Sequence, residues 1–491
     1  MSSISVDEKK RFFFSISIFF LFFFSIIFLR VFFIYEGNKS VYLLFSILSL
    51  YLIYFSFRKK SLFYETFFGI FLFLGFWFKF SIIIFFNLGF REGVNNLNLN
   101  SNFDYPLLIS VVGFLGFLVA GHLREIFFFY PKKININYEN NFYLKYRKII
   151  LIIFFISIII TCFLNFYFRI YQRGFIGQSY NIFITGFVRT ALLYGFSLCS
   201  AIILFLELLT YRKIFPSTIF IVLLESFLSS LSMLSRGMIF NIGSLFYGLY
   251  KISDNIKKKI KLDLNFFFKI FLIIFIFFYI SVNLINYARI KFLDLSLNLE
   301  KINSISDFES YPIKEHVSLN TNSYFKEFNN LLIHRWVGID SVLVVSNNKT
   351  ILNFDFLKSS LNEKFSLKSH SFYETSFNLK SGDIYKLSSL YKGNTLPGLI
   401  AFLFYSGSFF FLFFSMILIS FFASSIEFLS FKLLNYNLLF SAIIGQVIAY
   451  RLVHFGYLPS QSYLLFGSII VIIITFYCIK KIFINFNTNK T

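Results

Sequence analysis

The stretch FFFSISIFFLFFFSIIFLRVFFI, residues 12–34, decides the class of fold. A helix that crosses a bilayer needs roughly 20 mostly apolar residues, because the hydrocarbon layer is about 30 Å thick and each residue rises about 1.5 Å. The stretch meets that length, and Arg30 is its only charged residue. No small-residue cleavage site follows, so we expect a retained membrane span rather than a removed signal peptide.

The composition extends this interpretation to the whole chain. Of 491 residues, 57% are hydrophobic and 14% are charged, and the mean hydropathy is +0.72. A soluble domain carries about 25% charged residues. The composition therefore predicts an all-α polytopic integral membrane protein, with the lipid bilayer as its surroundings.

The same length rule predicts about twelve transmembrane helices. They fall at residues 12–34, 41–57, 66–86, 106–121, 149–168, 182–209, 214–233, 237–250, 266–286, 397–424, 436–453 and 462–479.

Basic residues gather in every second connection between these spans, for example at 9–11, 58–60 and 257–261. Cytoplasmic loops accumulate Lys and Arg in this way. The pattern places both termini in the cytoplasm and accounts for most of the formal charge of +22. Nucleic acid is therefore not needed as a partner.

One polar segment, residues 287–396, interrupts the pattern on the opposite side of the membrane. It divides the chain into helices 1–9 within residues 1–286, a large periplasmic loop, and helices 10–12 with a cytoplasmic tail within residues 397–491. Loops longer than about 15 residues are usually functional or disordered. The aromatic residues of this loop favour a partly helical, folded structure.

Residues 322–345 of this loop show helical periodicity, and Arg335 falls inside the apolar arc. A buried guanidinium needs a partner anion because it cannot lose its proton. Two interpretations stay open: a structural ion pair or snorkelling side chain, and an arginine that binds an anionic substrate.

Arg236 and Arg289 lie at predicted external span ends, at a depth comparable to that of Arg335. Three guanidiniums on one face would suit a phosphate or pyrophosphate, because the planar fork matches these groups. His334, Asp340 and His316 are candidate proton acceptors, in that order.

Neither the histidines nor Cys162, Cys199 and Cys478 show a metal-binding spacing, so we expect no metal and no cofactor. Within the spans, Lys79, Arg189, Glu207 and Glu225 are charged exceptions. Glu225 is expected to be protonated, or paired with Lys79 or Arg189, and a role in proton-coupled transport stays open.

The layout resembles the oligosaccharide repeat-unit polymerases, the Wzy or O-antigen polymerase family of bacterial inner membranes. The resemblance rests on the span count, the late external loop and three short stretches. These are Ser235-Arg236-Gly237, His334-Arg335-Trp336-Val337-Gly338, and Gly393-Asn394-Thr395-Leu396-Pro397-Gly398 leading into Tyr405-Ser406-Gly407-Ser408. An arginine followed eleven positions later by glycine, seen in some members, is not found at Arg173, Arg289 or Arg335.

The resemblance implies a metal-independent membrane glycosyltransferase. A glycan on undecaprenyl pyrophosphate would be transferred to an incoming lipid-linked repeat unit on the periplasmic face. Arg236, Arg289 and Arg335 would stabilise the pyrophosphate leaving group, and Trp336, Tyr311 and Tyr391 would stack on sugars. Lys392 and Arg173 complete the expected substrate-binding set. A chain-length regulator and a flippase are the protein partners that it implies.

Other membrane proteins share parts of this pattern. An O-antigen ligase would have the same late loop, arginines and catalytic histidine. A polysaccharide flippase, which is a transporter, is favoured by Glu225 and Lys79 but would have short loops. A glycosyltransferase of the dolichol-phosphate-sugar type would need acidic residues in a long first external loop, which this sequence lacks.

Overall fold

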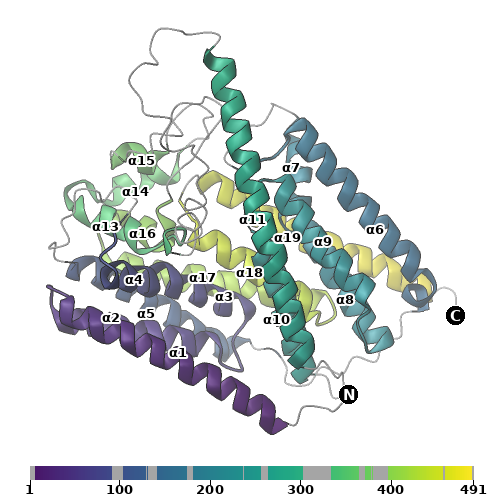
Figure 1. Cartoon of the computed structure of the whole chain (residues 1–491), viewed down its shortest axis with the longest axis horizontal. Coiled ribbons are helices and arrows are strands. Elements are labelled where there is room, and N and C mark those ends of the chain that lie inside the picture. The colour runs from purple at the N-terminus through teal and green to yellow at the C-terminus, as the bar shows by residue number, and fades with distance from the viewer. Residues whose placement is uncertain are drawn as a thin grey trace.

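The computed structural model describes most of the chain, and Figure 1 shows its arrangement. The described residues are 6–90, 103–128, 130, 141–173, 181–235, 237–255, 264–301, 333–363, 371–377, 379, 396–456 and 459–488. Within these ranges the structure is all helical and contains no strand. The predicted all-α class is confirmed for this part of the chain.

The helices before the large loop are mostly long. They are α1 (Val6–Ile34), α2 (Lys39–Ser56), α3 (Phe63–Phe73), α4 (Lys79–Phe85), α5 (Asp104–Phe127), α6 (Asn141–Phe168), α7 (Ile182–Thr190), α8 (Phe196–Tyr211), α9 (Pro216–Ser232), α10 (Met238–Asn255) and α11 (Leu264–Lys301). Two π-helical segments, η1 (Leu74–Phe78) and η2 (Ala191–Gly195), join α3 to α4 and α7 to α8 without a break. π-Helical turns inside helices often mark functional positions.

The helices of the loop are short, and three long helices follow them. The short ones are α13 (Ile339–Asn347), η4 (Lys349–Ile351), α14 (Phe354–Leu361), α15 (Phe372–Ser376), α16 (Gly398–Leu403) and η6 (Phe404–Ser406), and the long ones are α17 (Phe409–Leu433), α18 (Leu438–Val453) and α19 (Pro459–Thr488). In Figure 1 the short helices α13 to α16 gather at one end of the long ones. The fold is thus a bundle of long helices with small helices over one end.

Nine helices of the described residues are long and apolar enough to cross a membrane, so the chain is a multi-pass membrane protein by length and composition. They span Ser17–Ile34, Lys39–Ser56, Phe63–Phe85, Asp104–Phe127, Phe142–Phe168, Phe183–Tyr211, Phe268–Arg289, Phe409–Leu433 and Tyr463–Lys481. The other three predicted spans, at 214–233, 237–250 and 436–453, also form helices. However, α9 and α18 are shorter apolar helices, and the last turns of α10 contain Lys251 and Asp254.

The predicted span at 397–424 begins too early. Gly407 has a φ of +69° and ends the short helix η6, and the Ser408 side chain then caps the amino terminus of α17. A left-handed backbone favours glycine and interrupts a helix. The long helix therefore starts at Phe409, and residues 398–406 belong to the small helices at the end of the bundle.

Glycines allow the central helices to approach closely. A Cβ on Gly116 of α5 would lie 2.7 Å from the Met416 Cβ of α17. A Cβ on Gly113 would lie 2.7 Å from the Ile400 side chain of α16. Small residues at such crossings let helix backbones pack tightly in a membrane. Gly113 and Gly116 therefore serve helix packing.

The predicted continuous helix at 322–345 is wrong over its described part. Residues 334–338 form a turn, and α13 begins only at Ile339. The backbone of Val337 and Gly338 lies directly on Gly75 of η1, so that a Cβ on either glycine would overlap the facing carbonyl. This close backbone contact breaks the periodicity that the sequence suggested, and residues 322–332 lie outside the described residues.

Candidate anion-binding site

A buried ion pair holds the 334–338 turn against the bundle. Lys79 Nζ lies 2.6 Å from Asp340 Oδ2, and each side chain is 1% exposed. The same ammonium donates to the carbonyl oxygens of His334 at 3.1 Å and Trp336 at 2.9 Å. The sequence suggested Asp340 as a proton acceptor and Lys79 as a partner of Glu225. Instead the two residues pair with each other and fix the turn.

The turn presents two functional candidates in different environments. Arg335 is exposed at its tip, whereas Trp336 is half-buried. The expectation that Arg335 lies on the apolar face of a helix is therefore wrong. The Trp336 ring lies 6.3 Å from Phe71 and 6.4 Å from Phe240, measured between ring centroids. Both partners also contact Tyr450, at 6.0 Å and 5.2 Å.

Tyr450 connects this aromatic cluster to an arginine and a histidine. Its hydroxyl accepts a 3.4 Å hydrogen bond from Arg173 Nη1. Its ring stacks on His454, with centroids 4.1 Å apart. His454 Nδ1 lies 2.9 Å from the Tyr450 carbonyl oxygen. Because a carbonyl can only accept, Nδ1 carries the proton and Nε2 of the neutral ring is an acceptor.

Arg289 of α11 joins the chain segments that follow α6 and α9. Its Nη2 donates to the Leu234 carbonyl at 2.6 Å and to the Arg173 carbonyl at 3.2 Å. The Arg173 amide in turn donates to the Met233 carbonyl at 2.9 Å. The chain after α6, the end of α9 and the helix α11 therefore meet at this guanidinium. Two predicted site residues, Arg173 and Arg289, come together in this way.

Arg189 and Arg451 enlarge the group, and neither was proposed as a site residue from the sequence. Arg189 Cζ lies 5.4 Å from the centroid of the Tyr171 ring. Burial raises the pKa of the Tyr171 hydroxyl, but the charges of Arg189, Arg173 and Arg451 outweigh it and lower that pKa overall. Three guanidiniums are therefore close enough to Tyr171 to interact electrostatically with its hydroxyl group.

The pKa of His454 is also affected by three arginines. Burial, together with the smaller effects of the charges of Arg335, Arg173 and Arg451, lowers the pKa of His454 to about 3, and the hydrogen bond to Tyr450 opposes this shift. The exposed arginine of the turn and the two arginines of the bundle thus act on one imidazole. We call Arg173, Arg189, Arg289, Arg335 and Arg451 the arginine group.

Carboxylates neutralise cations at the opposite ends of these helices. Arg58 and Arg124 bind Glu65, Arg58 and Lys60 bind Glu125, and Arg147 binds Glu207. With Lys79–Asp340, these are the ion pairs between residues whose side chains the structure describes. Arg173, Arg189 and Arg451 take part in none of them, and Arg451 Nε is buried without a hydrogen-bond partner in the described part of the chain. No carboxylate of the described residues therefore neutralises Arg173, Arg189 or Arg451.

The other predicted site residues fall outside this description. Arg236, His316, Tyr311, Tyr391 and Lys392 lie outside the described residues. Arg236 is two residues after Leu234, whose carbonyl oxygen accepts a hydrogen bond from Arg289. Among the described residues, no group of three or more His, Cys, Asp or Glu side chains is placed to hold a metal ion.

A signal for Arg451 was present in the sequence. It lies near the external end of the predicted span 436–453, as Arg236 and Arg289 do for theirs. Tyr450 precedes it and His454 follows one helical turn later. Reading all external span ends for arginine would have found it.

Glu225 is placed apart from the arginine group. Its carboxylate accepts hydrogen bonds from Ser226 at 3.1 Å and from Ser197 and Ser229 at 3.3–3.4 Å. Neither Lys79 nor Arg189 pairs with it in the described structure. Of the two expected states, pairing with Lys79 or Arg189 is therefore not seen among the described residues, and three hydroxyl groups donate to Glu225 instead.

A comparison with protein-family models, with curated proteins and with solved structures finds no match to this chain.

Proposed function

We propose that this protein is a membrane glycosyltransferase that polymerises lipid-linked oligosaccharide repeat units. The donor would be a glycan on undecaprenyl pyrophosphate, and the acceptor an incoming lipid-linked repeat. The arginine group would lie on the periplasmic face of a bacterial inner membrane, with both termini cytoplasmic. A flippase would supply the repeats, and a chain-length regulator would act on the product.

The observation that carries this proposal is the convergence of Arg173, Arg335 and Arg451, for which the described residues supply no carboxylate partner. Arg335, Arg173 and Arg451 all act on His454, and Arg289 holds the backbone that bears Arg173. Breaking the bond between a sugar and a pyrophosphate develops negative charge on the leaving group. Preorganised guanidiniums stabilise such charge where it forms, without a metal.

The neighbouring residues support the sugar side of the reaction. Trp336 lies beside Arg335 and offers an aromatic ring to a sugar face. The attacking hydroxyl needs a proton acceptor within hydrogen-bond reach. His334, on the same turn as Arg335, is our candidate base. The low pKa of His454 makes it a weak base, so we assign its Nε2 the role of orienting a hydroxyl.

The position of the group fits a lipid-linked substrate. Arg451 lies in the last turn of the apolar helix α18, and Arg289 ends the apolar window of α11. A substrate whose lipid tail is in the bilayer would bring its pyrophosphate to this depth. The Lys79–Asp340 ion pair supports the same arrangement, because it keeps the turn with Arg335 fixed to the bundle.

The test is Arg451→Gln in the native host, with surface glycans separated by length and lipid-linked intermediates extracted. A polymerase defect leaves single repeat units on the surface acceptor. Lys213→Gln, which removes an exposed cation beside α9, is the matched control and should leave glycan length unchanged.

Two other outcomes would replace the proposal. Long lipid-linked chains that never reach the acceptor would identify an O-antigen ligase. Repeat units that stay on the cytoplasmic side would identify a flippase. In both cases the arginine group would still bind an anion. A ligase would catalyse a different transfer, and a flippase would catalyse no reaction.

A further inference from the structure

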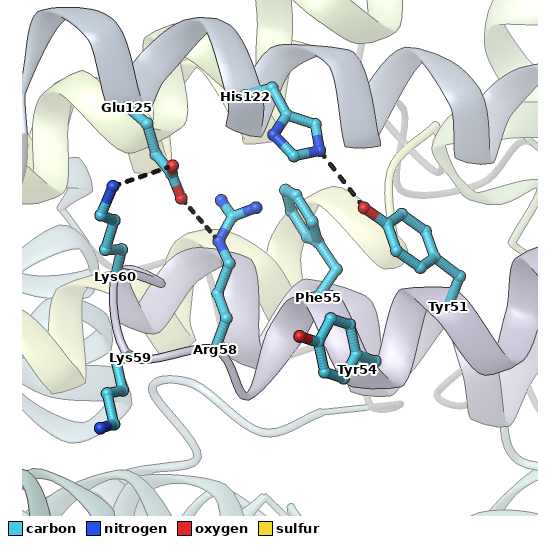
Figure 2. A pocket seen from close by; sticks show the side chains of 8 residues that line it. All are labelled: Tyr51, Tyr54, Phe55, Arg58, Lys59, Lys60, His122 and Glu125. Atoms are coloured by element: carbon cyan, nitrogen blue, oxygen red, sulfur yellow. Dashed lines mark hydrogen bonds and ion pairs between the residues drawn. The ribbon is translucent and has the colours of Figure 1, made fainter.

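A second basic site lies at the opposite end of the bundle from the arginine group. Figure 2 shows a pocket between the ends of α2 and α5, lined by Tyr51, Tyr54, Phe55, Arg58, Lys59, Lys60, His122 and Glu125. Its volume is about 220 Å³. None of these residues belongs to the site described above.

The charges that line the pocket do not balance. Arg58, Lys59 and Lys60 face a single carboxylate, Glu125. Arg58 Nε lies 2.8 Å from Glu125 Oε1, whereas Lys60 Nζ is 3.8 Å from Oε2 and its side chain is 65% exposed. Figure 2 shows the Lys59 ammonium directed away from Glu125. Lys59 therefore pairs with no carboxylate of the described residues, and Lys60 has only a long, exposed contact that a phosphate can replace.

Arg58 is held rigidly with one nitrogen unused. Its guanidinium carbon lies 3.3 Å from the Phe55 ring centroid, and Nη2 donates to Glu65 at 3.2 Å. A Cβ on Gly121 would overlap the Phe55 ring and lie 3.2 Å from Nη2, so the glycine makes room for this packing. Arg58 Nη1 has no hydrogen-bond partner within the described structure. That atom is buried, so the guanidinium acts on the pocket through its fixed positive charge.

The pocket opens beside apolar, exposed side chains. Tyr54 on α2 is 72% exposed, and Ile126 and Phe127 on α5 are 77% and 70% exposed. Both helices are candidate membrane spans, so these side chains face lipid tails. The basic pocket thus lies where a headgroup meets its acyl chains, and basic pockets between spans bind anionic lipid headgroups.

We propose that this pocket binds the phosphate-bearing headgroup of an anionic phospholipid. Lys59 and Lys60 hold the phosphate, Arg58 adds a fixed positive charge beside it, and the acyl chains lie over Tyr54, Ile126 and Phe127. Glu125 competes with the phosphate for Arg58. A lipid without net charge lacks the attraction that the lysines provide. The site joins the ends of two helices and is independent of the proposed reaction.

The experiment measures lipid retention by the purified full-length chain. The protein is incubated with vesicles of phosphatidylcholine that contain phosphatidylglycerol, and native mass spectrometry counts the bound lipids. Lys59→Gln combined with Lys60→Gln should lower phosphatidylglycerol retention by about tenfold, because each cation contributes to attraction of an anionic lipid. Both lysines are exposed, so the fold should persist, which size-exclusion chromatography checks.

Two further variants make the result specific. Glu125→Gln removes the competing carboxylate and should increase retention. Lys432→Gln combined with Lys481→Gln removes two exposed cations from the same end and should leave retention unchanged. These lysines lie near the contact in which Lys480 Nζ donates to the Leu433 carbonyl at 2.8 Å.

The proposal is overturned if the two lysine pairs affect retention equally, because surface charge alone would then explain binding. Loss of retention in Glu125→Gln would also overturn it. Inorganic phosphate or glycerol phosphate that displaces the lipid at equal concentration would identify a site for soluble anions. Glycan length is a separate readout, so failure here leaves the proposed function intact.

Discussion

Lys79 in the membrane-spanning helix α4 and Asp340 in the short helix α13 form an ion pair of 2.6 Å, and both side chains are buried. The two residues are 261 positions apart in the sequence. They meet because the fold brings α13 into contact with η1, the segment just before Lys79. Lys79 also binds two carbonyls of the 334–338 turn. The placement of Arg335 and Trp336 therefore depends on a lysine that binds the backbone of their turn.

Lys79→Met should destabilise the protein by about 3–5 kcal/mol, because it leaves a carboxylate buried without its cation. Chemical unfolding in detergent measures this change. The combined variant Lys79→Met with Asp340→Leu should recover part of the loss, since two apolar groups replace a buried pair at little cost. A single variant with unchanged stability would contradict the ion pair.

Gly75→Ala should destabilise the protein by about 1–3 kcal/mol, the range typical of overpacking. The new methyl group would overlap the Val337 carbonyl and push the turn away from η1. Gly243→Ala in α10 is the matched control, because nothing lies within 4 Å of its added Cβ. Equal thermal shifts in the two variants would show that the turn does not rest on Gly75.

His454 should make stability fall as the pH is lowered. Its pKa is about 3 in the folded protein and about 6.5 when unperturbed, so the unfolded chain binds more protons between these values. Stability is full above about pH 6.5 and decreases by up to about 1.4 kcal/mol per pH unit down to about pH 3. Unfolding measured across this window should show a smaller slope in His454→Gln. An unchanged slope would assign the pH dependence to other groups.

Arg451→Gln should lower the affinity for undecaprenyl pyrophosphate, and Arg451→Lys should not restore it. Hydrogen bonds to charged groups contribute about 1.5–3 kcal/mol, which corresponds to roughly a tenfold to hundredfold loss of affinity for a pyrophosphate lipid. Lysine keeps the charge but lacks the planar fork. Binding of undecaprenyl pyrophosphate in nanodiscs measures both variants. Full recovery with lysine would reduce Arg451 to a point charge.

Much of the helical architecture could be predicted from the sequence, because a bilayer imposes a length and an apolar composition that hydropathy reads directly. The stretch at 12–34 falls within α1, and residues 149–168 fall within α6. Local backbone features escaped this reading. Gly407 ends a helix inside an apolar run, and Gly338 ends the apparent periodicity before Ile339.

The site was predicted in part, and the reason is again physical. Arginine at external span ends pointed to Arg289, and the structure joins it to Arg173. Periodicity placed Arg335 on a buried arc, where the structure has an exposed turn. No local pattern could reveal that Asp340 meets Lys79, because that contact arises only from the packing of α13 on η1. Long-range charge pairing is a property of the fold, not of either sequence neighbourhood.

The uneven distribution of counterions between the two ends has a practical consequence for handling the protein. Arg173, Arg189 and Arg451, which have no carboxylate partner among the described residues, repel one another, and dissolved salt weakens that repulsion. Multivalent oxyanions in a purification buffer should therefore preserve this end of the bundle better than chloride at the same ionic strength. At the other end Glu65 and Glu125 bind Arg58, so that end should depend less on the anion of the buffer.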